Sequence, residues 1–215
     1  MTDALPLRTL ADLGPLVRAL PAPDAAAAEA ARARLGALAM PPGALGRLGE
    51  TVPFLAGWQG REAPRLERVQ ALVFAGNHGV CAQGVAAFPP AVTAAMVATF
   101  EGGGAAINQL CREAGAALDV VALDLDRPTA DFTAGDAMTE DEALEALARG
   151  AAAVDPEADA LVLGEMGIGN STTAATLAAL HLGGAVEDWV GPGAGADDTV
   201  MGRKRAAVAA AVRRH

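Results

Sequence analysis

Aromatic residues are scarce in this sequence. The chain of 215 residues contains only 3% Phe and Trp and no Tyr, although 52% of its residues are hydrophobic. Its core must therefore be built mainly from Ala, Val and Leu, which favours closely packed helices over large interlocking side chains. The length suits one large domain, or one domain with a small appendage.

Cysteine and positive charge are also limited. The two cysteines, Cys81 and Cys111, have no metal-type spacing, so we expect no disulfide framework and favour a reducing cytoplasm. With 16 Lys and Arg against 26 Asp and Glu, the formal net charge is -10. A nucleic-acid partner is excluded, because a phosphate backbone needs a basic surface. A small anion could still be held by backbone dipoles and a few well-placed cations.

Long hydrophobic runs and the common nucleotide motifs are missing. Charged residues interrupt the leucines of residues 1–20, which predicts neither a signal peptide nor a membrane span. There is no G-x-x-x-x-G-K-[ST] and no G-x-S-x-G. The spacing of Gly164, Gly167 and Gly169 also departs from G-x-G-x-x-G, which disfavours a nicotinamide-dependent oxidoreductase.

Secondary-structure patterns divide the chain into a helical beginning and an alternating remainder. Asp24 is a good N-cap for a helix over residues 24–40, Pro41 and Pro42 stop it, and a second helix is expected over 45–58. Apolar runs then predict strands over residues 69–75, 118–123 and 158–163, and a short fourth strand over 186–190. Between and after them, helices are expected over 90–101, 105–114, 139–153, 171–182 and 202–214. This alternation predicts an α/β fold with a parallel sheet, in which ligands bind beyond the carboxyl ends of the strands.

The segment GEMGIGNSTT, residues 164–173, is the strongest site candidate. It follows an expected strand and opens an expected helix, where free N–H groups and the helix dipole attract phosphate. An ordinary glycine-rich turn with a capping Asn or Ser is the alternative. A carboxylate would repel a phosphate, so Glu165 should point away from the anion if the site is real.

Two further segments carry polar or glycine-rich residues. His78, in Gly76-Asn77-His78-Gly79, could act as an acid or base, but a structural or pocket-forming role is favoured. Lys204, which follows Gly193 and Gly195, could reach a phosphate as a point charge, although a solvated helix face is the usual outcome. Asp197 and Asp198 have no other metal ligands near them in sequence, so no metal is expected.

Five blocks taken together identify a family resemblance. They are residues 41–50 (PPGALGRLGE), 73–80 (VFAGNHGV), 88–109 (FPPAVTAAMVATFEGGGAAINQ), 164–173 (GEMGIGNSTT) and 190–195 (VGPGAG). In this order they resemble the nicotinate-nucleotide–dimethylbenzimidazole phosphoribosyltransferases, from about residue 20 onward. Asn77 stands where many relatives carry Asp, and Ala86 lies where relatives often carry Ser.

The resemblance implies an activity. The family transfers the phosphoribosyl group of nicotinate mononucleotide to 5,6-dimethylbenzimidazole, giving alpha-ribazole 5'-phosphate and nicotinate with inversion at C1', a step in making the lower ligand of cobalamin. It implies no metal and no organic cofactor, a homodimer, no membrane, and a cytoplasmic location. The implied fold is a Rossmann-like parallel sheet flanked by helices. Residues 1–62 would be a helical preface belonging to a small helical domain, and residues 63–215 an incomplete Rossmann-like α/β domain.

The resemblance also assigns the site residues. Glu165 matches an active-site glutamate that is not the principal base. The expected phosphate- or nucleotide-binding residues are Gly167, Gly169, Asn170, Ser171, Thr172, Gly193, Gly195 and Lys204. The expected benzimidazole-pocket residues are Asn77, His78, Phe88 and Met96.

One departure from the family pattern bears on activity. The family's principal base is a glutamate in a glycine-rich segment that these 215 residues do not reach. Because the last expected helix ends without a Gly, Asn or Pro stop signal, the sequence predicts an interrupted chain with little turnover by itself. The alternative is a non-catalytic nucleotide-binding module that retains only the phosphate loop.

Overall fold

A computed structural model describes residues 7–215. The segment over residues 1–20, which was predicted to be neither a signal peptide nor a membrane span, therefore lies partly outside the described residues. The chain forms two compact units. One contains residues 11–69 and 157–160, and the other contains residues 7–10, 70–156 and 161–215. None of the helices in residues 7–215 is long and apolar enough to cross a bilayer.

The smaller unit is helical, as predicted. It contains the short helix α1 (Leu13–Arg18), α2 (Ala25–Gly36) and α3 (Leu48–Gln59). The Asp24 carboxylate accepts hydrogen bonds from the N–H groups of Ala26 and Ala27, which confirms it as the N-cap of α2. Helix α2 ends earlier than the expected residue 40, because Gly36 is a poor helix former just before the Pro-Pro-Gly stop. Buried Ala31 and Ala56 are small enough to let α2 and α3 pack closely.

The larger unit is built on a three-stranded parallel sheet, which confirms the predicted α/β class. Its strands are β1 (Val69–Gly76), β2 (Ala117–Leu123) and β3 (Ala160–Met166), in the order β2-β1-β3. Central β1 pairs with β2 in a register that sets Val73 opposite Val120. Its Ala71, Leu72, Val73 and Ala75 are all buried, as expected for a strand covered on both faces.

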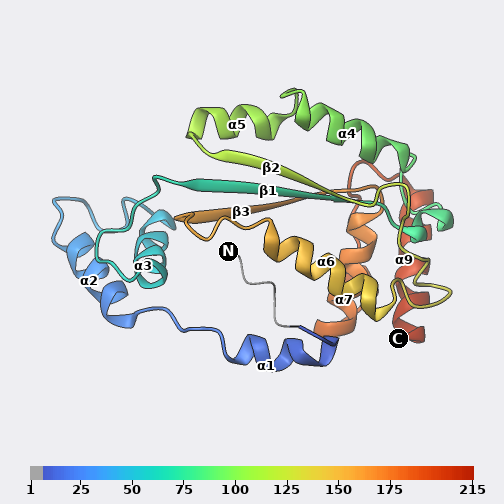
Figure 1. The fold of residues 1–215 in the computed structure, drawn as a ribbon, viewed down its shortest axis with the longest axis horizontal. Coiled ribbons are helices and arrows are strands. Elements are labelled where there is room, and N and C mark those ends of the chain that lie inside the picture. The colour runs from blue at the N-terminus through green and yellow to red at the C-terminus, as the bar shows by residue number, and fades with distance from the viewer. Residues whose placement is uncertain (1–6) are drawn as a thin grey trace. The chain divides into compact units, whose positions relative to one another are not determined.

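Helices lie on both faces of this sheet (Figure 1). Helices α4 (Ala91–Glu101) and α5 (Ala106–Ala114) lie over one face, while α6 (Glu140–Ala152) and α7 (Asn170–Leu182) lie on the other. The glycines at 102–104 separate α4 from α5, as predicted. These bounds agree with the sequence predictions to within one or two residues, except that β3 starts and ends a little later than expected.

The predicted fourth strand over residues 186–190 is wrong. Residues there form the short helix α8 (Val186–Trp189). Its start is fixed by the Asp188 carboxylate, which accepts a hydrogen bond from the Ala185 N–H at 3.1 Å. The Trp189 indole N–H donates to the carbonyl of Gly183 at 2.8 Å, folding the segment back on itself. These local polar contacts outweigh the strand preference of Val186, Trp189 and Val190.

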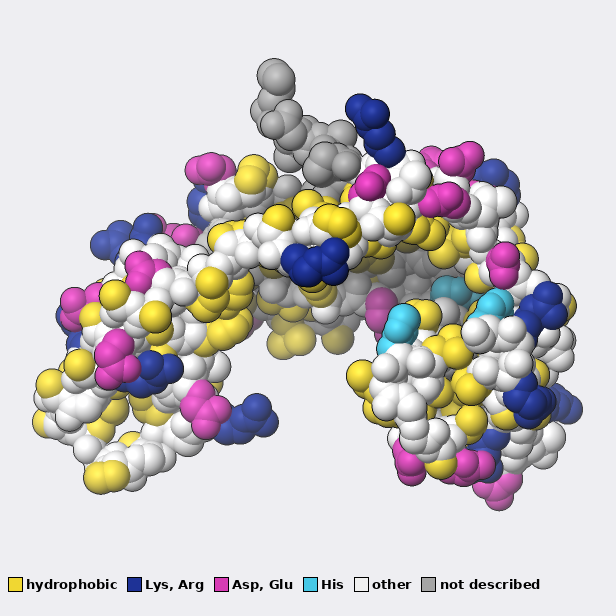
Figure 2. All heavy atoms as spheres, turned by 90° about the horizontal axis from the view of Figure 1, so that it is seen from below, with side chains coloured by type: hydrophobic (Ala, Val, Ile, Leu, Met, Phe, Trp, Pro, Cys, Tyr) yellow, Lys and Arg dark blue, Asp and Glu magenta, His cyan; other side chains and the backbone are white. Residues whose placement is uncertain are grey.

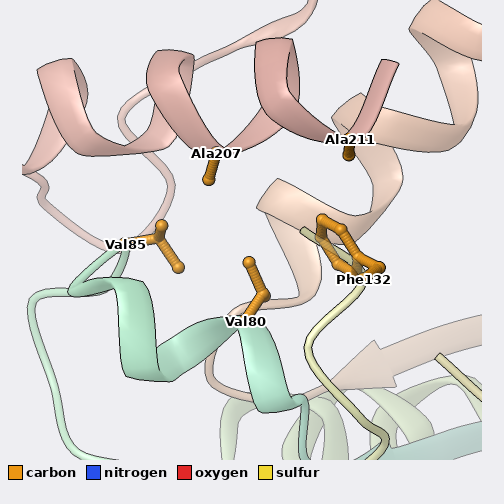
Figure 3. Close-up of a cluster of buried hydrophobic side chains, with 5 residues drawn as sticks. All are labelled: Val80, Val85, Phe132, Ala207 and Ala211. Carbon is orange, nitrogen blue, oxygen red and sulfur yellow. The ribbon is translucent and has the colours of Figure 1, made fainter. Parts of the chain in front are cut away.

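The last helix, α9 (Asp198–Arg214), begins four residues earlier than predicted because Asp197 caps it. The Asp197 carboxylate accepts from the Val200 N–H at 2.8 Å. Helix α9 packs against α7 and against the 3-10 turn η2 (Gly79–Gln83). Figure 3 shows the core that joins the turn to the helix: Val80, Val85 and Phe132 point toward Ala207 and Ala211. This packing holds the face of α9 that carries Ala207 and Ala211 against the turn.

The surface follows the composition. On the face drawn in Figure 2, Lys and Arg side chains lie singly or in small groups among Asp and Glu side chains, and outside the grey atoms this face has no continuous basic patch.

Candidate phosphate and heteroaromatic site

The carboxyl ends of the three strands meet at one edge of the sheet, and the loops that follow them form the candidate site. Asn77 and His78 follow β1, Leu125 and Asp126 follow β2, and Gly167 follows β3. A cavity of about 480 Å³ opens between the first two loops and the start of α4. Its lining residues are Asn77, His78, Gly79, Cys81, Ala82, Pro90, Ala91, Ala94, Leu125, Asp126 and Pro128.

The glycine-rich loop before α7 is held on both sides. The buried Thr93 hydroxyl of α4 accepts a hydrogen bond from the Ile168 N–H at 3.1 Å. On the other side the Cys81 thiol donates to the Ile168 carbonyl, also at 3.1 Å. Burial raises the pKa of the Cys81 thiol, so the sulfur is a protonated donor rather than a thiolate at neutral pH.

Gly169 is required by this loop geometry. Its φ of 96° lies in the region that only glycine adopts freely. A Cβ there would also stand 2.8 Å from the Cys81 sulfur, closer than real side chains approach. Without a side chain at this residue, the backbone can turn from β3 into α7 and present the first N–H groups of the helix.

Lys204 is the cation of the site. Its side chain is only 2% exposed, and its Nζ donates to the Ser171 hydroxyl at 3.0 Å and to the Gly191 carbonyl at 2.6 Å. Among residues 7–215, no carboxylate forms an ion pair with it. Burial accordingly lowers the pKa of Lys204. A buried cation whose only partners are neutral oxygens is suited to an anionic ligand.

Gly193 makes room for this arrangement. Its φ is 55°, and a Cβ there would stand 2.9 Å from the Ser171 hydroxyl and 3.4 Å from Lys204 Nζ. The segment after α8 can therefore pass directly over the pair formed by Ser171 and Lys204. The first turn of α7, the buried lysine and a glycine backbone meet at one place.

A chain of polar contacts links this loop to the cavity. The Asn170 amide nitrogen donates to the Glu165 carboxylate, and the amide oxygen of Asn170 lies 2.5 Å from Nε2 of His78. Burial lowers the pKa of His78, and the contact with Asn170 and the charge of Glu165 only partly oppose that effect. The ring is therefore neutral at neutral pH.

Three buried polar atoms near the site lack partners within residues 7–215. They are the Thr172 hydroxyl in the first turn of α7, the Thr129 hydroxyl in the segment that bridges to His78, and the amide oxygen of Asn77, whose nitrogen donates to the Leu125 carbonyl. Buried polar atoms are nearly always paired, so all three are candidates for contact with a ligand or water.

The structure brings most of the predicted site residues together, but not all. Glu165, Gly167, Gly169, Asn170, Ser171 and Thr172 lie in or beside one loop, with Gly193 and Lys204 against it. Asn77 and His78 line the cavity. Phe88 and Met96 do not line it, and Phe88 is 49% exposed. No atom approaches the Cβ position of Gly195, and its φ is 107°.

Several residues at the site were not predicted from the sequence. Thr93 and Cys81 clamp the loop, and Asp126 lines the cavity. Thr93 lies within an apolar helix pattern and Cys81 follows Val80, so the neighbouring residues in the sequence do not mark either of them as a site residue. Asp126 could have been found from its place just after a strand. In residues 7–215 no three His, Cys, Asp or Glu side chains gather as metal ligands would.

Fold and site together define a parallel α/β protein with a buried lysine against the start of one helix and a cavity of about 480 Å³ beside it. Comparison with known proteins agrees: the model of a phosphoribosyltransferase family matches residues 20–215. The chain belongs to this phosphoribosyltransferase family, which confirms the resemblance seen in the sequence.

The relatives carry the name expected from the sequence motifs. The nicotinate-nucleotide–dimethylbenzimidazole phosphoribosyltransferase of Ruegeria pomeroyi is 57% identical over 209 residues, which are 97% of this chain and 62% of that protein. The protein of the same name from Cereibacter sphaeroides is 55% identical over 210 residues, 98% of this chain and 62% of its own length. The crystal structure of CobT from Thermus thermophilus superimposes with a TM-score of 0.81 at 41% identity, covering 88% of this chain and 63% of that one. The chain thus spans about three fifths of the length of these relatives.

Proposed function

We propose that this chain binds nicotinate mononucleotide and is part of an enzyme that transfers its phosphoribosyl group to 5,6-dimethylbenzimidazole. The observation that carries the proposal is Lys204, a buried cation without a carboxylate partner in residues 7–215, set against Ser171 in the first turn of α7. The names of the relatives support the choice of substrates. The products would be alpha-ribazole 5'-phosphate and nicotinate.

The charge of the molecule supports a local phosphate site. With a net charge of -10, the protein as a whole repels an anion, so binding must come from groups at close range. The N-terminus of α7 supplies a favourable dipole and the Ser171 N–H, while the N–H groups of Asn170 and Thr172 already donate to the carbonyls of Gly167 and Gly169. Lys204 supplies a full positive charge. A phosphate placed there would also give the buried lysine the counter-charge that it lacks.

The neighbouring cavity supports a flat heteroaromatic acceptor. Its volume of about 480 Å³ lies within the usual range for small-molecule sites, and Pro90, Ala91 and Ala94 give it an apolar wall. We propose that Phe88 and Met96 contribute beyond this wall, as the family pattern implies. His78 and Asn77 supply polar contacts on the other side.

The proposed reaction is a displacement at C1' of the ribose. A carboxylate takes the proton from one imidazole nitrogen of the dimethylbenzimidazole, and the other nitrogen attacks C1' from the face opposite nicotinate. The bond from C1' to nicotinate breaks, so the configuration inverts from beta to alpha. Holding both reactants in line is the main contribution that the protein makes. Glu165 is the candidate secondary carboxylate, and we propose that the principal base lies outside these 215 residues.

The test compares this chain with a chimera that continues into the corresponding last part of the Ruegeria pomeroyi relative. Each protein is incubated with nicotinate mononucleotide and 5,6-dimethylbenzimidazole, and the product anomer is identified by NMR. The proposal predicts mononucleotide binding with little turnover for the 215-residue chain, and the alpha product from the chimera. A chimera that binds both substrates but forms no product would contradict it and favour a non-catalytic nucleotide-binding module.

Two further parts of the proposal rest on the family resemblance. We propose a homodimer and a cytoplasmic location. Sedimentation equilibrium of the chimera and of the 215-residue chain tests the first, with a monomeric chimera as the contrary result.

A further inference from the structure

Thr93 places a fully buried hydroxyl on the inner face of α4. Its neighbour on that face, Val97, is buried and apolar. A threonine within a helix often donates to the carbonyl four residues before it, as Thr99 does to Ala95 at 2.8 Å. Within residues 7–215 Thr93 forms no such bond, and its hydroxyl instead accepts from the Ile168 N–H. Since valine has nearly the same shape, packing alone does not account for a hydroxyl at this residue.

This hydroxyl and the Cys81 thiol hold two consecutive peptide groups. The Ile168 N–H belongs to the peptide that joins Ile168 to Gly167, and it is held by Thr93. The Ile168 carbonyl belongs to the peptide that joins Ile168 to Gly169, and it is held by Cys81. The two contacts therefore restrict rotation about both backbone bonds of Ile168. This restriction matters because the next residue, Gly169, has no side chain to limit its own rotation.

The loop held in this way leads directly into the part of α7 that would meet a phosphate. The N–H groups of Asn170 and Thr172 already donate to loop carbonyls, whereas the Ser171 N–H donates to no group in residues 7–215. The Ser171 hydroxyl lies 3.0 Å from the buried Nζ of Lys204. Because a hydrogen bond weakens steeply as it bends, a small rotation of the loop would turn the Ser171 N–H away from an anion beside Lys204.

We propose that Thr93 and Cys81 are positioning residues for phosphate binding, which act through the two peptide groups of Ile168. They hold the loop so that the Ser171 N–H and Lys204 converge on one anion, and they do so without contacting the anion themselves. The inference rests on the proposed function and deepens it, because it names the groups beside the phosphate site that set its geometry.

The test measures how much the phosphate contributes to binding. It compares the affinities of the 215-residue chain for nicotinate mononucleotide and nicotinate riboside by titration calorimetry, and the unchanged chain should favour the mononucleotide roughly tenfold or more. Thr93→Val leaves the Ile168 N–H unpaired, and the ratio of the two affinities should fall by roughly fivefold, the effect of one hydrogen bond. Thr93→Ser keeps the hydroxyl and should restore the ratio.

Thr99→Val is the matched control on the same helix. It removes a hydroxyl that bonds to its own helix and not to the loop, so the ratio should stay that of the unchanged chain. Urea unfolding gives the stability of each variant. If Thr93 had only a structural role, Thr93→Val would lower the free energy of unfolding and leave the ratio of the two affinities unchanged.

A second pair of variants tests the other peptide group, and it decides the question if Thr93→Val does not fold. Cys81 is only half-buried, so replacing it disturbs the core less. Cys81→Ala removes the donor to the Ile168 carbonyl and should lower the ratio of the two affinities. Cys81→Ser keeps a donor at this position and should retain most of the ratio.

Two results would overturn the inference. One is a folded Thr93→Val or Cys81→Ala variant that keeps the ratio of the unchanged chain. The other is an equal fall of the ratio in Thr93→Val and Thr99→Val. Both leave the proposed function standing as long as the unchanged chain prefers the mononucleotide. If the unchanged chain shows no such preference, the proposed phosphate site fails, and this inference fails with it.

Discussion

At the scale of single residues, Lys204 is held in surroundings that suit an anionic ligand. It lies in a run of three basic residues, yet Arg203 and Arg205 are exposed and only Lys204 is buried. The reason is helical spacing, because Lys204 shares a face of α9 with Val208 and Ala211, which pack inward. Because Val208 and Ala211 pack inward, the Lys204 side chain on the same face of α9 also points into the interior.

Replacing this lysine should weaken phosphate recognition without unfolding the protein. In Lys204→Met, the affinity for nicotinate mononucleotide should fall by roughly ten- to a hundredfold, the effect of losing one charged hydrogen bond. Arg205→Met on the exposed face of the same helix is the matched control and should bind normally. Calorimetry measures both variants, and equal losses in the two would show that Lys204 has no special role.

His78 should make stability depend on pH in a defined direction. Its pKa is lowered in the folded protein, so the unfolded chain binds more protons just below the unfolded value of about 6.5. The free energy of unfolding should therefore fall as the pH falls below that value and stay constant, as far as His78 is concerned, above it. Urea unfolding of the unchanged chain and of His78→Gln between pH 7.5 and about 5.5 isolates this contribution. Identical pH profiles would contradict it.

Gly169 should tolerate no side chain. Gly169→Ala would strain a backbone with a φ of 96° and press a methyl group against the Cys81 sulfur, so we expect a loss of about 1–3 kcal/mol in the free energy of unfolding. In the double variant with Cys81→Ala the contact is relieved but the strain is not. Gly169→Ala should therefore lower the free energy of unfolding by less in the Cys81→Ala background than in the unchanged chain. Equal losses in the two backgrounds, measured by denaturant titration, would refute the contact.

At the scale of helices and strands, the local signals in the sequence predict some features well and others poorly. Asp24 was predicted as an N-cap and Thr139 as the first residue of a helix, and both side chains accept helix N–H groups. The apolar run of β1 could be predicted because both faces of a central strand are buried. Residues 186–190 were misread because two valines and a tryptophan in so short a segment do not distinguish strand from helix, and the deciding contacts come from Asp188 and Trp189.

The capping box of α6 offers a direct measurement at this scale. The Thr139 hydroxyl accepts from the Glu142 N–H, while the Glu142 carboxylate accepts from the Thr139 N–H at 2.8 Å. Thr139→Ala should lower the free energy of unfolding by about 1 kcal/mol, whereas Thr139→Ser should keep most of it because the hydroxyl remains. Chemical denaturation compares the three proteins. A serine variant as unstable as the alanine variant would show that the hydroxyl does not act as the cap.

At the scale of the whole molecule, the sequence predicts the family and the sheet edge that carries the site. It could not predict how the parts of that edge connect. The Glu165–Asn170–His78 chain joins residues 92 positions apart, and Thr93 reaches Ile168 across 75 positions. Such contacts depend on the order of the strands, which no local pattern encodes. The benzimidazole-pocket roles of Phe88 and Met96 remain predictions, because neither residue lines the cavity next to His78.

The central claim is that the start of α7 and Lys204 recognise the phosphate of a nucleotide. The most direct measurement is a calorimetric titration of the 215-residue chain with nicotinate mononucleotide, beside nicotinate riboside, which has no phosphate, and NAD as a dinucleotide control. We predict saturable binding of the mononucleotide, roughly tenfold or more tighter than the riboside, and weaker binding of NAD. Equal affinity for mononucleotide and riboside, or no binding of either, would contradict the account.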